Sequence, residues 1–188
     1  MICIKIGMLS ALMRMASTDE NRVTLNGVYF DSTGFAVATD GPAMMVCRIP
    51  TFVGPSFRVG LAVLAAKIKA RKANKSMVKV RLESSILIEA TDATDYPPWR
   101  LVYPKTISLE PAQFDSAILE RALRALRDLT GEKLTAPLEM LPNGDSAGFV
   151  VTNEPDVSIV VMPFRTSDQY TQAGAKVKAL GFLENNKA

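Results

Sequence analysis

Short apolar runs separated by turn-forming residues dominate residues 21–50. The apolar runs are Val23–Phe30, Phe35–Ala38 and Ala43–Ile49, and the residues between them are rich in Asp, Ser and Gly. Asp and Ser hydrogen-bond to the local backbone in turns, and Gly tolerates a positive φ, so both interruptions favour tight turns. Pro50 then removes a backbone donor and ends the last run. This stretch predicts a three-stranded antiparallel meander.

A strand and a helix precede the meander. Ile2–Ile6 alternates weakly between apolar and polar residues and stops at Gly7, which indicates a short strand. Apolar residues then recur through Met8–Ser17 at the spacing that places them on one face of an amphipathic helix. The chain up to Pro50 is therefore predicted to form one β-α-β-β-β half-unit.

The same order of elements then begins again. Phe57–Val59 predicts a short strand, and Leu61–Ala73 predicts an amphipathic helix. Met77–Glu83 alternates apolar and charged residues as a half-buried strand does, and Ile86–Ala90 is predicted to pair with it. A proline-rich extended segment, Thr94–Pro104, follows this second half-unit.

A third copy of the pattern follows. Ile107–Leu109 predicts a strand, and a helix is expected to begin near Pro111 and to end at Gly131, since Pro suits the first helical position and Gly the residue after the last. Three further strands are predicted at Pro137–Leu141, Gly148–Thr152 and Val157–Phe164. Strong turn signals separate these three strands.

Internal repetition of this kind defines the fold class. We predict an α+β fold of three β-α-β-β-β half-units, with helices on one face of antiparallel sheets. We expect residues 1–105 to form a domain of two half-units and residues 106–165 to add one more. Residues 166–188 have a different, polar composition and are expected to form a tail.

Composition narrows the class of protein. The chain has 188 residues, of which 48% are hydrophobic and 22% charged, as in an ordinary soluble globular protein. Cys3 and Cys47 lie in apolar runs without CxxC spacing, which indicates buried, reduced thiols in a cytoplasmic protein. No apolar run is long enough to cross a bilayer. The sequence has no histidine, and we find no glycine-rich phosphate loop and no cluster with metal-ligand spacing, so we expect neither an enzyme nor a cofactor.

Three motifs occur in an order that resembles a known family. Residues 22–30 read R-x-x-L-N-G-V-x-F, and the sequence ATDG at residues 38–41 and a Met-rich strand come after them. Residues 96–102 read YPPWRLV, and residues 160–165 read VVMPFR. They resemble segments of the middle domain and the chain end of bacterial β sliding clamps, the DNA polymerase III beta subunit. Where the clamps have DGHR, this chain has Asp40-Gly41-Pro42-Ala43. The resemblance implies a DNA-clamp-like fold, shortened as in a clamp that a phage or plasmid would carry.

In clamps the three motifs meet in a pocket that binds short peptides of polymerases and other replication factors. The resemblance implies a peptide-binding pocket here too, with an apolar floor and arginines that fix carbonyl or acidic groups. Its residues would be Arg22, Leu25, Thr39, Gly41, Met44, Pro97, Leu101, Val102, Val160, Val161, Met162, Pro163 and Arg165.

Clamps also encircle duplex DNA with basic helices that face inward. The resemblance implies that two basic helices here would contact phosphates without reading sequence. The candidates are Lys67, Lys69, Arg71, Lys72 and Lys75 in the second predicted helix, and Arg121, Arg124 and Arg127 in the third. The net charge of +3 neither requires nor excludes this contact.

Two functions remain open at this stage. The first is a reduced sliding clamp, a homo-oligomeric ring that tethers a polymerase to duplex DNA. Four chains of three half-units would supply the twelve half-units of a clamp ring. The second is a clamp mimic without a ring, which competes for replication peptides or docks on a host clamp. An odd number of half-units leaves a sheet edge unpaired, so we also expect self-association through the first or third half-unit.

Overall fold

A computed structural model describes residues 2–50, 52–73, 85–88, 96–131 and 139–164. The first unit holds β1 (Ile2–Lys5), α1 (Ile6–Met15), β2 (Gly27–Asp31), β3 (Phe35–Thr39) and β4 (Ala43–Arg48). The second holds β5 (Phe57–Gly60), α2 (Leu61–Ala73) and β6 (Ser85–Ile88), and the third holds α3 (Ser116–Thr130), β7 (Met140–Leu141), β8 (Gly148–Val150) and β9 (Val157–Val161). Two 3₁₀ turns, Val23–Leu25 and Trp99–Leu101, lie outside the sheets.

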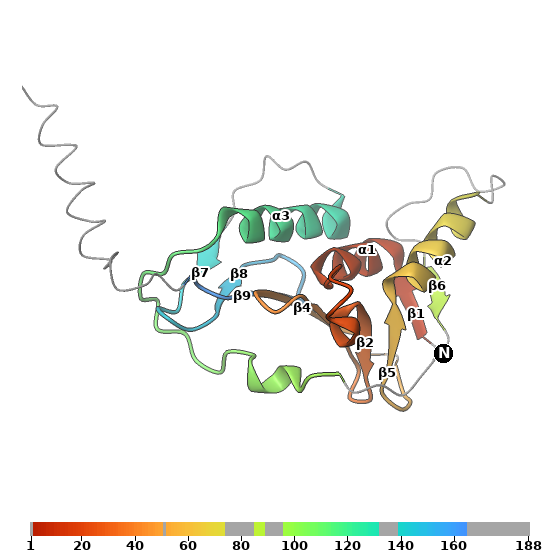
Figure 1. Ribbon diagram of the computed structural model, residues 1–188, viewed down its shortest axis with the longest axis horizontal. Coiled ribbons are helices and arrows are strands. Elements are labelled where there is room, and N and C mark those ends of the chain that lie inside the picture. Colours follow the sequence, from red (N-terminus) through yellow and green to blue (C-terminus); the bar gives the residue numbers. More distant parts are fainter. Residues whose placement is uncertain (1, 51, 74–84, 89–95, 132–138, 165–188) are drawn as a thin grey trace, which may run out of the picture.

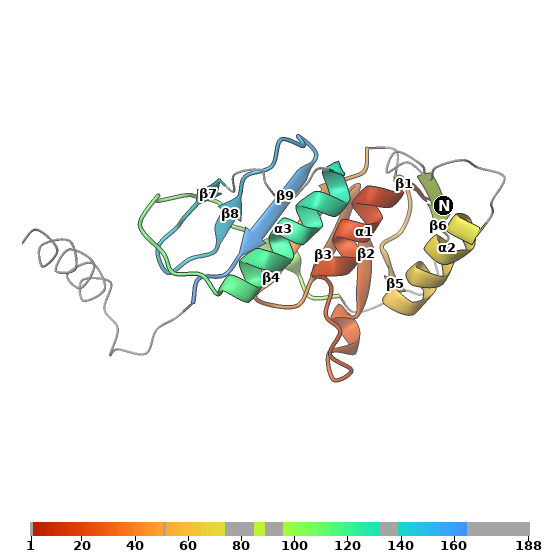
Figure 2. The same ribbon diagram turned by 90° about the horizontal axis from the view of Figure 1, so that it is seen from above.

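The strands form two antiparallel sheets. One has seven strands in the order β5-β2-β3-β4-β9-β8-β7, and the other pairs β1 with β6. The helices lie together over one face of the large sheet, with α1 between α3 and α2 (Figures 1 and 2). The predicted α+β class, with antiparallel sheets and helices on one face, is therefore confirmed.

Each face of the large sheet buries its own apolar cluster. On the helix side, Leu9, Leu12 and Met15 of α1 pack with Met45 of β4 and with other strand residues. These four named side chains are fully buried. A second cluster lies on the opposite face. We call it the outer-face cluster, and its members are the buried Val37, Met44, Val46, Trp99, Ala147 and Val160 with the partly buried Tyr29, Phe35, Tyr96, Tyr103, Phe149 and Met162. Strand alternation explains the division, because neighbouring residues such as Met44 and Met45 point to opposite faces.

Most predicted elements are confirmed within a few residues. The meander strands, the helix over residues 61–73 and the end of α3 at Gly131 are all present. Gly131 has a φ of 74° and its N–H donates to the Arg127 carbonyl, so it ends the helix in the left-handed conformation. The helix α1 begins at Ile6 rather than Met8, because the chain passes from β1 into the helix without a loop. The strand predicted at 77–83 lies outside the described residues.

Two predictions in the third unit are wrong. Residues 107–109 form no strand, because the side chain of Asn143 bonds the backbone there in place of a strand partner: Asn143 Oδ1 accepts from Ser108 N at 2.8 Å, and its Nδ2 donates to the Thr106 carbonyl at 3.0 Å. The helix α3 does not begin at Pro111. Its N-cap is Asp115, whose side chain accepts a hydrogen bond from Ala117 N at 2.8 Å.

The prediction for the cysteines is correct for only one of them. Both are free, but Cys3 is exposed, because β1 alternates and only Ile2 and Ile4 point into the core. Cys47 is buried as predicted. Burial, with a smaller contribution from the charge of Asp156, raises the pKa of the Cys47 thiol and keeps it protonated.

The third unit joins the first in one continuous sheet. β4 pairs with β9, with Met44 opposite Val160, and α1 packs mainly against α3. Arg14 of α1 donates to Asp128 of α3 through Nε at 2.7 Å. The division at residue 105 remains a prediction. The structure shows that strand pairing and helix packing both cross between the first and third units.

Candidate functional site

Strand pairing brings the first and last motifs together. The β4–β9 ladder sets Met44 opposite Val160, and beyond the end of β9 the N–H of Met162 donates to the Pro42 carbonyl at 2.8 Å. Met44, Val160 and Met162 all belong to the outer-face cluster. Two of the three motifs that resemble clamp segments therefore share one surface.

The middle motif crosses the same surface. Residues 96–103, which we call the crossing segment, run over the outer face of the sheet below β2 and β4 in Figure 1. Ring contacts fix the crossing segment along its length, with centroid distances of 4.5 Å for Tyr29–Tyr96, 5.7 Å for Phe35–Trp99, 6.0 Å for Trp99–Tyr103 and 5.5 Å for Tyr103–Phe149. Because Tyr29 and Phe35 belong to the first unit and Phe149 to the third, the crossing segment ties the two units together.

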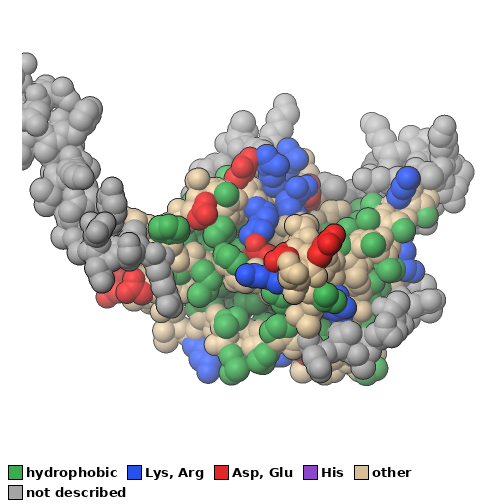
Figure 3. Space-filling model, in the orientation of Figure 1, with side chains coloured by type: hydrophobic (Ala, Val, Ile, Leu, Met, Phe, Trp, Pro, Cys, Tyr) green, Lys and Arg blue, Asp and Glu red, His purple; other side chains and the backbone are tan. Residues whose placement is uncertain are grey.

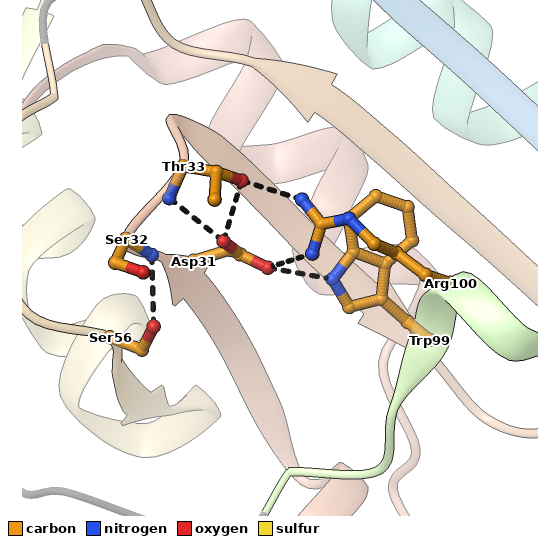
Figure 4. Close-up of polar contacts among 6 residues, drawn as sticks. All are labelled: Asp31, Ser32, Thr33, Ser56, Trp99 and Arg100. Carbon is orange, nitrogen blue, oxygen red and sulfur yellow. Dashed lines mark hydrogen bonds and ion pairs between the residues drawn. The ribbon is translucent and has the colours of Figure 1, made fainter.

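A buried carboxylate anchors the crossing segment (Figure 4). Asp31, at the end of β2, accepts hydrogen bonds through Oδ2 from Trp99 Nε1 at 3.1 Å and from Arg100 Nη1 at 2.5 Å. Its Oδ1 accepts from the backbone N–H and the hydroxyl of Thr33, at 2.8 and 2.7 Å. The Arg100 guanidinium also lies 4.2 Å from the centre of the Trp99 ring, within the range of a cation–π contact.

The same contacts determine the charge of Asp31. Burial by itself raises the pKa of this carboxyl, but the hydrogen bonds from Arg100, Thr33 and Trp99 together outweigh burial and lower the pKa to about 2. Asp31 is therefore ionised at neutral pH although its side chain is only 8% exposed. A charged acceptor makes stronger hydrogen bonds than a neutral one, which suits an anchor.

The predicted pocket residues of the crossing segment lie on its exposed side. Leu101 is 78% exposed and Val102 59% exposed, and Pro97 is also exposed. Large apolar side chains with this exposure, next to a buried apolar cluster, form a surface suited to apolar anchors of a partner. Val161 lies on the other face of β9, in the helix-side core, so its side chain does not reach this surface.

The turn between β3 and β4 carries the other predicted residues. Thr39 Oγ1 donates to the Ala43 carbonyl at 2.6 Å and accepts from Gly41 N at 3.0 Å, which fixes the turn. Gly41 has a φ of 105°, and an added Cβ would lie 3.1 Å from Arg22 Nη1. The turn therefore requires glycine at this position. Leu25, part of a 3₁₀ turn, is half-buried, and its carbonyl accepts from Ser17 N at 3.1 Å.

A small pocket lies beside this turn. We call it the turn pocket; it has a volume of about 240 Å³ and is lined by Ser17, Thr18, Asp19, Arg22, Asp40, Pro42 and Arg121. Arg22 Nη1 donates to the Asp40 carbonyl at 2.7 Å, and Arg121 of α3 forms an ion pair with the Asp40 carboxylate. The pocket is smaller than most small-molecule sites, which span roughly 300–1,000 Å³, and its size suits one side chain of a partner.

The arginines predicted to face DNA are largely engaged within the protein. Arg121 pairs with Asp40, and Arg124 pairs with Glu120 one helical turn away. Figure 3 shows Lys and Arg side chains near the top centre, in the region of α3, interspersed with acidic ones. Arg127 is exposed and makes no ion pair within the described residues. In α2, Lys67 is half-buried and Lys69 exposed, whereas the side chains of Arg71 and Lys72, and all of Lys75, lie outside the described part.

Sequence reasoning missed the residues that hold the site together. Asp31 reads as a turn residue, and Asp40 and Arg121 carry no sequence signal that they meet. Pro163 is half-buried in the segment that follows β9, and Arg165 lies outside the described residues.

Neither a metal site nor a membrane-spanning helix is found within the described residues. Within them, no group of three or more Cys, Asp or Glu side chains is arranged to hold a metal ion. No helix in the described ranges is both long and apolar enough to span a membrane.

Comparison with solved structures identifies the fold. The structure superposes on the DNA polymerase III beta subunit of Thermotoga maritima with a TM-score of 0.61 at 13% sequence identity, covering 88% of this chain and 65% of that one. For the sliding clamps of Caulobacter crescentus and Bacillus subtilis the TM-score is 0.56 in both cases, at 18% and 13% identity, and 88% of this chain covers 65% and 64% of theirs.

The sequence itself gives no such match. No protein-family model matches the chain, and a search of curated proteins finds no match either. The chain spans slightly less than two thirds of the length of the solved clamps. Together these findings show a chain with the fold of the bacterial DNA polymerase III sliding clamps.

Proposed function

We propose that this protein is a non-catalytic, sliding-clamp-like replication protein that binds short peptides of a polymerase or another replication factor. In this proposal the chain assembles with copies of itself and holds its partner at duplex DNA. One observation carries the proposal: residues of three motifs far apart in sequence, among them Tyr29, Trp99 and Met162, pack in the outer-face cluster, on the sheet that joins the first and third units.

The site has the two parts that a short peptide needs. The partly buried Met162 of the outer-face cluster and the exposed Leu101 and Val102 of the crossing segment supply apolar surface for anchor side chains. Across the turn, Arg22 in the turn pocket supplies donors for a carbonyl or carboxylate of the peptide. An extended peptide that passes over the turn would contact both parts.

Peptide binding is the direct test of this proposal. We expect Met162→Ala and Arg22→Ala each to weaken binding of a fluorescein-labelled clamp-binding peptide by more than about 1 kcal/mol, because each removes an anchor contact. Fluorescence polarisation measures the affinity. The matched controls are Met140→Ala, a half-buried methionine against the helix-side core, and Arg127→Ala, an exposed arginine on α3. Equal affinity for all four variants and the wild type would exclude this site.

Binding to duplex DNA distinguishes the ring from the second candidate function. The second candidate is a clamp mimic that keeps the peptide site without encircling DNA. The pairing of Arg121 and Arg124 with acidic residues favours the mimic, since paired arginines contribute less to phosphate binding. The basic helices that the clamp resemblance implies favour the ring.

For the ring we expect weak binding to duplex DNA that falls steeply with salt. Arg127→Glu should lower the affinity several-fold at low ionic strength. Arg48→Glu is the control, because Arg48 is an exposed arginine in register with Met44 and Val46 on the face away from the helices. A salt series by polarisation with a labelled duplex measures both. Binding that Arg48→Glu weakens as much as Arg127→Glu would rule out the helix face.

A further inference from the structure

The first two units exchange their leading strands. β5, the strand before α2, pairs antiparallel with β2 of the first unit, from Gly27 opposite Gly60 to Phe30 opposite Phe57. β1, the strand before α1, pairs antiparallel with β6 of the second unit. In both units the segment that leads into the helix therefore becomes a strand by pairing with a different unit.

The third unit has such a leading segment, residues 106–110, and it is not a strand. Asn143 bonds Ser108 N and the Thr106 carbonyl, and Gly144 N donates to the Glu110 carbonyl at 3.1 Å. The bonds at Thr106 and Ser108 occupy one edge, because alternate residues of an extended chain point their backbone groups to opposite sides. Within the described residues, the N–H and carbonyl of Ile107 make no hydrogen bond.

Apolar side chains accompany this open edge. Ile107 is 41% exposed and Leu109 62% exposed, and Phe164, whose N–H donates to the Gln113 carbonyl at 2.6 Å, is 58% exposed. Leu109 also has a φ of 59°, a conformation that leucine rarely adopts. The leading segment is thus strained at Leu109, and it combines exposed apolar side chains with the unbonded backbone groups of Ile107.

The third unit also ends the large sheet. β7 is the last strand in the order, so its outer edge has no strand beside it among those the structure describes. Its counterpart in the first unit, β2, has that edge covered by the leading strand β5 of another unit. The third unit therefore has an unpaired sheet edge at β7 and a leading segment, residues 106–110, that pairs with no strand among those the structure describes.

We infer that two copies of this chain pair through their third units, each placing its segment 106–110 against the β7 edge of the other. Such a contact is isologous, because the same two elements meet twice about a two-fold axis, and it closes without leaving a free edge at that point. The occupant is a second copy because the internal exchange between the first and second units already shows a leading segment of this chain completing another unit.

This inference goes beyond the proposed function, which does not specify which surface joins the copies. Two such dimers would also supply four chains, the number that completes a ring of twelve half-units. The two proposals can fail separately, because light scattering measures the mass of the oligomer whereas the peptide titration measures the affinity for the peptide.

The test is light scattering of the full-length protein after size exclusion, at high micromolar concentration. We expect a dimer, or a tetramer built from two dimers. Ile107→Pro removes a backbone donor that is not bonded within the described residues and places a ring on the edge, so it should halve the mass or reduce it to that of a monomer. Leu109→Lys puts a charge on the same edge and should act in the same direction.

Val53→Lys is the matched control, because Val53 is 90% exposed and lies in the loop between β4 and β5, outside both segment 106–110 and β7. It should keep the mass of the wild type. Circular dichroism confirms that each variant is folded. A monomeric wild type at high micromolar concentration would overturn the inference, and so would an oligomer whose mass neither Ile107→Pro nor Leu109→Lys reduces.

Discussion

Replacing Trp99 with alanine is expected to lower the free energy of unfolding by about 3–5 kcal/mol, the range for removing a large aromatic side chain from a packed site. Trp99 is 8% exposed and contacts the rings of Phe35 and Tyr103. Its removal also leaves Asp31 without the Nε1 donor.

The loss should extend to the candidate site. Arg100 separates Leu101 from Trp99, and Leu101 and Val102 belong to the crossing segment that the ring contacts of Trp99 hold against the outer-face cluster. Without Trp99, the ordering of the crossing segment would have to be restored by the peptide at the cost of binding energy. We therefore expect Trp99→Ala to lower peptide affinity at least as much as Met162→Ala, under conditions where both variants are folded.

Urea unfolding followed by circular dichroism measures the stability change. The control is Leu101→Ala in the same segment, which removes a side chain that is 78% exposed and should change stability by less than about 0.5 kcal/mol. Trp99 is the only tryptophan of the chain, so its fluorescence reports release of the crossing segment in the wild type. If Trp99→Ala is as stable as Leu101→Ala, the crossing segment does not tie the two units together.

Local sequence patterns predicted most of the helices and strands correctly. They failed at residues 107–109, where a side chain takes the place of a neighbouring strand as hydrogen-bond partner of the backbone. The meander and the end of α3 follow from local signals, namely turn residues and a glycine after the helix. The pattern at residues 107–109 is equally strand-like, yet Asn143 satisfies that backbone from a distant turn. A strand needs a partner, and the sequence of one segment does not reveal whether a partner is present.

The candidate site was predictable only in part for a similar reason. Resemblance to clamp motifs identified Met44 and Met162, and strand pairing explains why they meet. Nothing local reveals that Asp40 pairs with Arg121, or that Asp31 binds Trp99, because both pairs join segments far apart in the chain. Charged residues at turns and on helix faces usually lie in solvent, and the clamp resemblance therefore placed Arg121 among the DNA-facing candidates without any sign of its pairing with Asp40.

Replacing Asp31 with asparagine is expected to cost about 2 kcal/mol of stability at neutral pH and almost nothing near pH 2. The folded pKa of about 2 lies below the ordinary value of 3.8, so ionised Asp31 contributes stability that is fully present above about pH 4. That contribution is lost as the pH falls through the folded pKa. A shift of nearly two units corresponds to about 2 kcal/mol, and this is an upper figure because the Arg100 side chain is 49% exposed.

Urea unfolding of wild type and Asp31→Asn at several pH values between 7 and about 2.5 tests this sign. The gap between the two midpoints should narrow steadily as the pH falls, because protonation of the wild type removes the same charge that the substitution removes. Asp145→Asn is the matched control, since Asp145 is an exposed acid in the turn between β7 and β8. A gap that stays constant with pH would mean that the shape of Asp31, and not its charge, anchors Trp99 and Arg100, and the ion pair would then contribute little to holding the first and third units together.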